Sequence, residues 1–260
     1  MARQVANVAG AIFQIGVPVV TGPAIGRISD ENSTLVVPAD YAFVIWTPIF
    51  LLALAYAVYQ ALPANRENPL LRRMGWFSAL TFFSNGTWEL LFPAREFVLA
   101  QTVFLGIFGS AVIAYVLVQR GASQDNRVER WLIAPAFGLL SGWITAAFLV
   151  SFATTLVASG VFNGGLGEAV AGALLLVAAG AIACAVIVAG RGGPVQGYLA
   201  HGAAILWAFA GVVVNQYDAS LLTTGAALLS VTLVAVALIS VLRRRRSHIG
   251  AGRSVRPRAA

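Results

Sequence analysis

The sequence predicts an all-α polytopic membrane protein with about eight transmembrane helices. Apolar residues make up 59% of the chain and charged residues only 10%, and the mean hydropathy is +0.82. A soluble domain carries about 25% charged residues, so a soluble fold is excluded. A spanning helix needs about 20 mostly apolar residues. The segments that meet this requirement are residues 6–25, 41–62, 74–93, 97–118, 131–157, 168–189, 195–214 and 220–242.

The first two predicted helices both contain proline. The segment at 6–25 is interrupted by Pro18 and Pro23, and no small-residue cleavage site follows it, so we expect a span rather than a cleavable signal peptide. The segment at 41–62 carries Pro48, which we expect in the helix interior. A proline there loosens the backbone and is tolerated where neighbouring helices satisfy the freed carbonyl.

The third predicted helix, 74–93, is the least apolar. It contains Asn85 and Glu89, which lie four residues apart and share one helix face. Asn85 is a candidate to bind a ligand or to hydrogen-bond another helix. Because Glu89 lies near the end of its span, we expect it to reach the membrane interface beside Arg95.

The fifth predicted helix carries a small-xxx-small pair, Gly138 and Gly142, which permits close contact with another helix. Trp143 follows directly, and a Trp at this depth needs a partner for its N–H or a cavity. The last three helices are dominated by Ala, Val, Leu and Gly. Among them His201 has no second ligand residue at a supporting position, so we favour a hydrogen-bonded or partly hydrated His over a metal or haem ligand.

Arginine placement predicts the topology. All 17 basic residues are Arg, and they concentrate in alternate loops and in the tail. This bias predicts an integral protein of the bacterial inner membrane with both termini in the cytoplasm. We expect residues 243–260 to form a basic, disordered tail that contacts membrane lipids. The net charge of +7 does not indicate a nucleic-acid partner, because the Arg residues do not gather on one face.

Catalytic signatures are lacking in the sequence. It contains no HExxH, CxxC, P-loop or Gly-x-Ser-x-Gly motif. No acid–base pair or nucleophile with a partner occurs at a useful spacing either. We therefore predict no enzyme, no catalytic residue, no metal site and no certain cofactor.

Three motifs in order resemble the tryptophan-rich sensory protein family, also called TspO/MBR or translocator protein. Residues 38–50, PADYAFVIWTPIF, are similar to its second helix, and the third-helix pattern Asn-x-x-Trp-x-x-Leu-Phe occurs at Asn85 and Trp88. Trp143 matches the fifth-helix Trp, whereas Ser151 stands where the family has Asn. In the second-helix motif, Phe43, Trp46 and Thr47 match, and Tyr41 and Phe50 replace a usual Trp and Tyr.

The resemblance implies a TspO-like five-helix bundle over residues 1–157, followed by three additional helices over 158–242. It also implies a tetrapyrrole, sterol-like or other apolar ligand between the helices, and often a homodimer. Light-dependent porphyrin breakdown is implied by the resemblance alone. The implied ligand-binding residues are Tyr41, Phe43, Trp46, Asn85, Trp88, Trp143 and Ser151.

Three functions stay open from the sequence. The first is binding of a planar tetrapyrrole or lipid-like ligand in an intramembrane pocket, for sensing, signalling or transport. The second is a structural or regulatory subunit of a larger membrane complex, in which the small residues of the last three helices form the partner surface. The third is a small-molecule transporter, with helices broken at proline.

Overall fold

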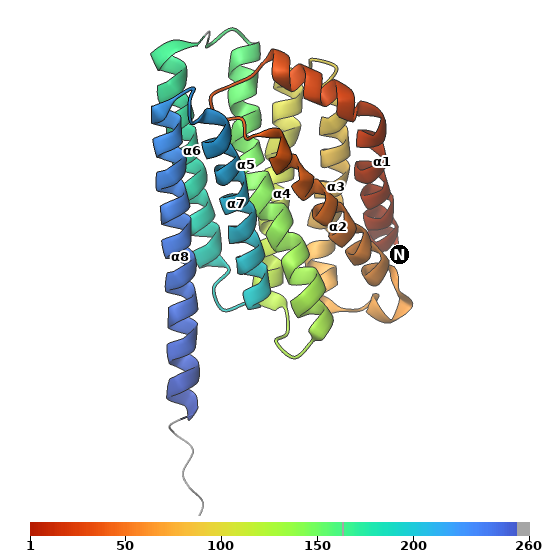
Figure 1. Ribbon diagram of the computed structural model, residues 1–260. Helices are drawn as coiled ribbons and strands as arrows, with labels where there is room; N and C mark the ends of the chain where they lie inside the picture. The colour runs from red at the N-terminus through yellow and green to blue at the C-terminus, as the bar shows by residue number, and fades with distance from the viewer. Residues whose placement is uncertain (163, 254–260) are drawn as a thin grey trace, which may run out of the picture.

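The structure is a computed structural model that describes residues 1–162 and 164–253, with side chains as far as Arg245. Within these ranges the chain forms helices and no strand (Figure 1). Each predicted span corresponds to one helix. The α-helices are α1 (Ala2–Glu31), α2 (Trp46–Ala61), α3 (Pro69–Leu91), α4 (Phe97–Gly121), α5 (Ala134–Ala158), α6 (Gly165–Ala189), α7 (Val195–Gln216) and α8 (Leu221–Arg253). The 3-10 helices η1 (Asp40–Ile45) and η2 (Pro63–Asn65) flank α2, and the π-helical turn η3 (Glu129–Ile133) leads into α5.

The predicted polytopic all-α membrane fold is confirmed. In the described part of the chain, seven helical segments are long and apolar enough to cross a membrane: all the α-helices except α3, with α2 joined to η1 and α5 joined to η3. α3 is long enough at 23 residues, but it carries Arg72, Arg73 and the buried Glu89 and Asn85. It packs between α1 and α4, so Asn85 and Glu89 lie inside the bundle, whereas Arg72 and Arg73 are exposed near its basic end.

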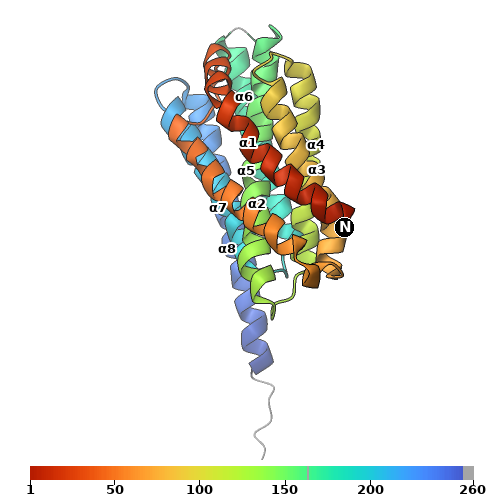
Figure 2. The same ribbon diagram turned by 90° about the vertical axis from the view of Figure 1, so that its right-hand side faces the viewer.

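The helices run alternately up and down the bundle (Figures 1 and 2). The main contacts pair α5 with α7, α3 with α4, α6 with α8, and α1 with α3. We call the end that holds the connections 62–68, 122–128 and 190–194 the basic end, because most loop Arg residues lie there. The other end, which holds the connections 32–39, 92–96 and 217–220, is the acidic end.

α8 is longer than expected from the sequence. It continues as a helix to Arg253 and extends past the basic end of the bundle (Figure 1). The prediction that the tail is disordered from residue 243 is therefore wrong for residues 243–253, because Arg is a good helix former and follows an apolar helix directly. Arg245 also donates to the carbonyl of Gly193 (2.8 Å) and to Gln124 Oε1 (3.1 Å). The rest of the predicted tail, 254–260, lies outside the described residues.

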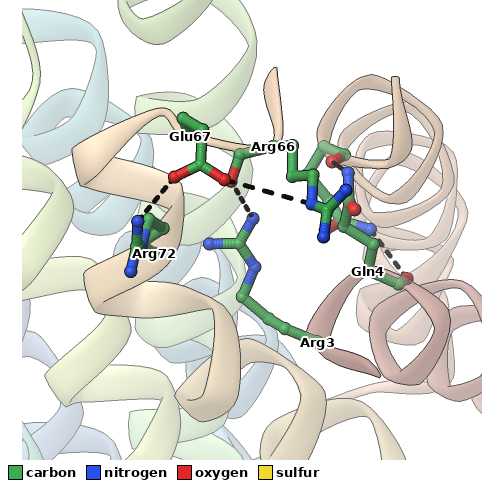
Figure 3. Close-up of polar contacts among 6 residues, drawn as sticks. Arg3, Gln4, Arg66, Glu67 and Arg72 are labelled. Atoms are coloured by element: carbon green, nitrogen blue, oxygen red, sulfur yellow. Dashed lines mark hydrogen bonds and ion pairs between the residues drawn. The ribbon is translucent and has the colours of Figure 1, made fainter. Parts of the chain in front are cut away.

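Side-chain hydrogen bonds fix the start of α1 at the basic end (Figure 3). Gln4 Nε2 donates to the carbonyl of Gln60 (2.8 Å), and Gln60 Nε2 donates back to the carbonyl of Gln4 (3.0 Å). Arg3 Nη2 reaches the carbonyl of Arg66 (3.2 Å). α1 is thereby tied to the end of α2 and to the connection that follows it.

The predicted close helix contact at Gly138 and Gly142 lies between α5 and α7. A Cβ on Gly138 would lie 3.1 Å from the Cβ of Ala200, and one on Gly142 would lie 2.9 Å from the Cβ of Ala204. Glycine is needed here because the α7 backbone occupies the space of a side chain. α7 is thus packed into α5 as closely as any neighbour within the predicted five-helix bundle.

Proline bends α1. Pro18 and Pro23 lie inside the helix, and the half that follows them lies across the acidic end of the bundle (Figure 1). Proline removes a helical hydrogen bond and crowds the preceding turn, which kinks the helix. Pro48 behaves differently from the prediction: α2 begins at Trp46, so Pro48 lies in the first turn. Its missing N–H costs little there, because the first N–H groups of a helix lack helical partners anyway.

Candidate functional site

A cavity of about 420 Å³ lies in the half of the bundle toward the acidic end. This volume is in the range of roughly 300–1,000 Å³ that small-molecule sites occupy. Residues from η1 and every α-helix except α8 line it, together with residues 36–38. The exposed lining residues Asp30 and Asp40 show that the cavity reaches the surface.

The structure brings most of the predicted site residues to this one cavity. Those that line it are Phe43, Trp46, Asn85, Trp88, Trp143 and Ser151. Trp143 lies edge-on to Trp46 (ring centroids 6.2 Å apart) and to Phe43 (5.7 Å). Trp46 in turn stacks on Phe50 (5.1 Å). These rings form one aromatic wall, built by η1, α2 and α5.

A second group of rings lines the cavity from α3 and α4. Trp88 stacks on Phe92 with the ring centroids 4.9 Å apart, and it lies edge-on to Phe104 at 5.3 Å. Phe104 was not expected from the sequence, because an isolated Phe in an apolar helix gives no signal for a site. Aromatic rings therefore line the cavity in two groups, one from η1, α2 and α5 and one from the end of α3 and α4.

Tyr41 does not line the cavity, contrary to the predicted ligand-binding set. Its ring is 45% exposed and lies edge-on to Trp207 of α7, with the centroids 5.4 Å apart. The indole Nε1 of Trp207 donates to the carbonyl of Ala42 (2.8 Å). Tyr41 thus packs η1 against α7, because the turn of η1 directs its ring away from Phe43 and Trp46.

Glu89 is the buried acidic group of the site. It is only 4% exposed, and its Oε1 accepts a hydrogen bond from Asn85 Nδ2 (3.0 Å). Its Oε2 has no hydrogen-bond partner among the described residues. The expectation that Glu89 lies beside Arg95 at the interface is wrong, because Arg95 pairs with Glu31 of α1. The helix face that Glu89 shares with Asn85 turns it toward the cavity instead.

Two indole N–H groups of the site are also unpaired. The Nε1 atoms of Trp88 and Trp143 are buried, and neither has a hydrogen-bond partner in the described part of the chain. Ser151 differs, because its Oγ donates to Gln101 Oε1 (2.8 Å) and joins α5 to α4. A buried polar group without a partner costs about 1–3 kcal/mol, so a ligand that pairs with these groups gains affinity.

The last three helices contribute to the site through α6 and α7, which sequence reasoning missed. Their lining residues are Leu175, Leu176 and Ala179 of α6 and Ala208, Phe209 and Val212 of α7. α7 also forms hydrogen bonds with the connection between α1 and η1, which lies at the mouth of the cavity. The N–H of Ala39 donates to the carbonyl of Gly211 (3.0 Å), and the side-chain amides of Asn215 and Gln216 donate to the carbonyl of Val37 (3.0 and 3.1 Å).

His201 lies outside the cavity, between α4, α5 and α7. Its Nδ1 hydrogen-bonds Ser141 Oγ (2.9 Å), and its ring stacks on Tyr115 with the centroids 5.1 Å apart. The prediction of a hydrogen-bonded His is confirmed. Within the described residues, no group of three His, Cys, Asp or Glu side chains could hold a metal ion.

The comparisons with known proteins agree with the sequence motifs. The family model of the TSPO-like protein matches residues 4–240, which takes in α1 to α7 and more than half of α8. The match therefore also covers the helices after residue 157. Neither a curated protein nor a solved structure matches the chain. Because the family model covers most of its length, the chain belongs to the TSPO-like protein family.

Proposed function

We propose that this protein binds an apolar, planar ligand in the cavity of its acidic half, for sensing or transport. The observation that carries the proposal is the convergence of Trp46, Trp88 and Trp143, from three different helices, on one cavity. Flat rings gain about 0.5–1.5 kcal/mol from each well-placed aromatic neighbour beyond the area they bury. The unpaired Nε1 atoms of Trp88 and Trp143 would donate to polar atoms at the edge of such a ligand.

Membership of the TSPO-like family supports a tetrapyrrole or a sterol-like molecule as the class to test first. We also propose that the basic end faces the cytoplasm, since Arg-rich loops stay on that side of the membrane. The ligand would then occupy the half of the bundle that faces away from the cytoplasm. It would enter near Asp30 and Asp40, the exposed lining residues.

Titration of the purified protein with protoporphyrin IX dimethyl ester, followed by Trp fluorescence, tests the proposal. The uncharged ester reports ring contacts without a contribution from charge. In a Trp46→Phe/Trp143→Phe double variant we expect the Kd to rise roughly tenfold, because two aromatic contacts are reduced.

The matched control is Trp76→Phe/Trp131→Phe. It removes the same number of indoles, but these side chains are 57% and 62% exposed and lie outside the cavity lining. The control should bind like the unmodified chain. Equal affinity of the two double variants for the ester would contradict a ligand site at this aromatic wall.

Transport of the ligand is a second candidate, favoured by the packing of α1. A Cβ at Gly22 or at Gly26 would meet no atom within 4 Å, although both residues lie in the part of α1 that lines the cavity after Pro18. A wall packed so loosely can move more easily than α5. Flux of the same ester from proteoliposomes distinguishes transport from binding alone.

A further inference from the structure

We propose that the ligand of this cavity carries a positive charge: a planar aromatic amine or a similar organic cation, not an anion. The inference rests on the proposed function, and it selects a cationic planar ligand over the neutral and anionic members of the classes to test first. It follows from the ionisable groups that line the cavity, from the unpaired oxygen of Glu89, and from the aromatic rings around it.

The charges around the cavity are all of one sign. Among the described residues that line it, the ionisable side chains are Asp30, Asp40 and Glu89, and none is Arg or His. The chain contains no Lys. An anionic ligand would therefore meet no positive side chain in the lining, whereas a cation would meet acidic groups with which it can pair.

Glu89 is the ionisable group buried inside the cavity. It is 4% exposed, and the hydrogen bond from Asn85 occupies only its Oε1. No ion pair reaches it from the described part of the chain, and its Oε2 is unpaired. Without a counter-charge a buried carboxyl holds its proton, and it ionises only when it is paired and hydrogen-bonded. A cationic ligand would provide the missing partner.

The aromatic walls also suit a cation. A positive charge is attracted to the face of an aromatic ring within about 6 Å, most strongly to Trp. Trp46 and Phe43 line the cavity on one side, and Trp88 and Phe92 line it near Glu89. The unpaired Nε1 atoms of Trp88 and Trp143 do not require an anion, because a neutral ether or carbonyl oxygen on the same ligand accepts from them equally well.

The mouth of the cavity would attract cations before they bind. Asp30 and Asp40 are exposed there, and neither takes part in an ion pair within the described residues. The nearby basic side chains, Arg27 and Arg95, share one partner, Glu31, so with Asp30 and Asp40 the mouth keeps a net negative charge of one. A cleft lined by one sign of charge raises the local concentration of the opposite ion, an effect that salt weakens.

Three acridines of the same ring skeleton test the inference: cationic 9-aminoacridine, neutral acridine and anionic acridine-9-carboxylate. Binding is measured by fluorescence to the protein in phosphatidylcholine nanodiscs, with empty nanodiscs subtracted. We expect 9-aminoacridine to bind roughly tenfold tighter than acridine, and the carboxylate to bind weakest. Equal or tighter binding of the carboxylate would overturn the proposal.

The variant Glu89→Gln keeps the size of the side chain and removes its charge. We expect it to bind 9-aminoacridine roughly tenfold more weakly while its affinity for neutral acridine changes little. Glu96→Gln is the matched control, because Glu96 is exposed at the same end of the bundle and outside the cavity lining. The same loss in both variants would overturn the role of Glu89. If Glu89→Gln does not fold, the order of affinity of the three acridines for the unmodified chain still tests whether the cavity prefers a cation.

The two proposals can fail separately. If the porphyrin ester binds and depends on Trp46 but the acridines show no charge preference, only the charge inference fails. If neither the ester nor any acridine binds, the proposed function fails as well.

Discussion

Replacing Gly142 by Ala tests how closely α5 and α7 are packed. The new Cβ would lie 2.9 Å from the Cβ of Ala204 and 3.0 Å from the carbonyl carbon of His201, and closer still to the oxygen of that carbonyl. None of these atoms can rotate away, because they belong to the α7 backbone or to its first side-chain carbon. Ordinary contact begins at 3.4 Å, so the helices must separate by at least 0.5 Å at Ala204 alone.

We expect this strain to destabilise the fold by about 1–3 kcal/mol, the usual effect of overfilling a packed site. Ala favours helix over Gly by about 1 kcal/mol, which offsets part of the loss. Gly109→Ala in α4 is the matched control, because its Cβ would meet nothing within 4 Å and it gains only the helix propensity. For a chain of this size, each kcal/mol corresponds to roughly 2–4 °C in Tm.

The assay is loss of helicity, measured by circular dichroism during heating and during SDS titration, with both variants in the same detergent. Gly142→Ala should unfold below Gly109→Ala by several degrees and at a lower SDS fraction. Equal stability of the two variants would refute the close α5–α7 contact and the role we give to Gly142.

Two further substitutions separate buried from exposed polar contacts. Asn7 donates to the carbonyl of Gly75 (2.7 Å) and accepts from Ser78 Oγ (2.6 Å), all buried, so Asn7→Ala should destabilise the fold by about 1–3 kcal/mol in the same SDS titration. An unchanged midpoint would contradict this network. Glu31→Gln breaks the exposed ion pair with Arg95 and should shift the midpoint by less than about 1 kcal/mol, with the shift smaller still in high salt.

The helices could be predicted from the sequence, because the length of each apolar segment determines where a membrane-spanning helix can form. Every predicted span coincides with a helix. The least apolar predicted span, 74–93, corresponds to α3, the helix that is not apolar enough to qualify as a membrane span. The sequence could not give the extension of α8 to Arg253, because a run of Arg fits a disordered tail as well as a helix. The prediction also put Pro48 in the helix interior instead of the first turn of α2, because the start of α2 depends on how η1 packs.

Part of the candidate site could be predicted as well. Trp46, Trp88 and Trp143 occur in recognisable motifs, and the bundle brings them to one cavity. Leu176 of α6 and Phe209 of α7 could not be found, because a cavity-lining apolar residue and a lipid-facing one look alike in a sequence. The inward direction of Glu89 depends on the rotation of α3, which only the packing against α1 and α4 determines.

Because α6 and α7 line part of the cavity, a shortened chain that lacks them would not form the whole cavity. A chain that ends at residue 158 would keep all the tryptophans of the cavity but lose the lining from α6 and α7 and the hydrogen bonds that hold Val37 and Ala39. The glycine face of α5 would then meet lipid instead of α7. The proposed binding of a ligand would thus depend on all the helices up to α7, and the segment that carries the family motifs would not form the whole cavity by itself.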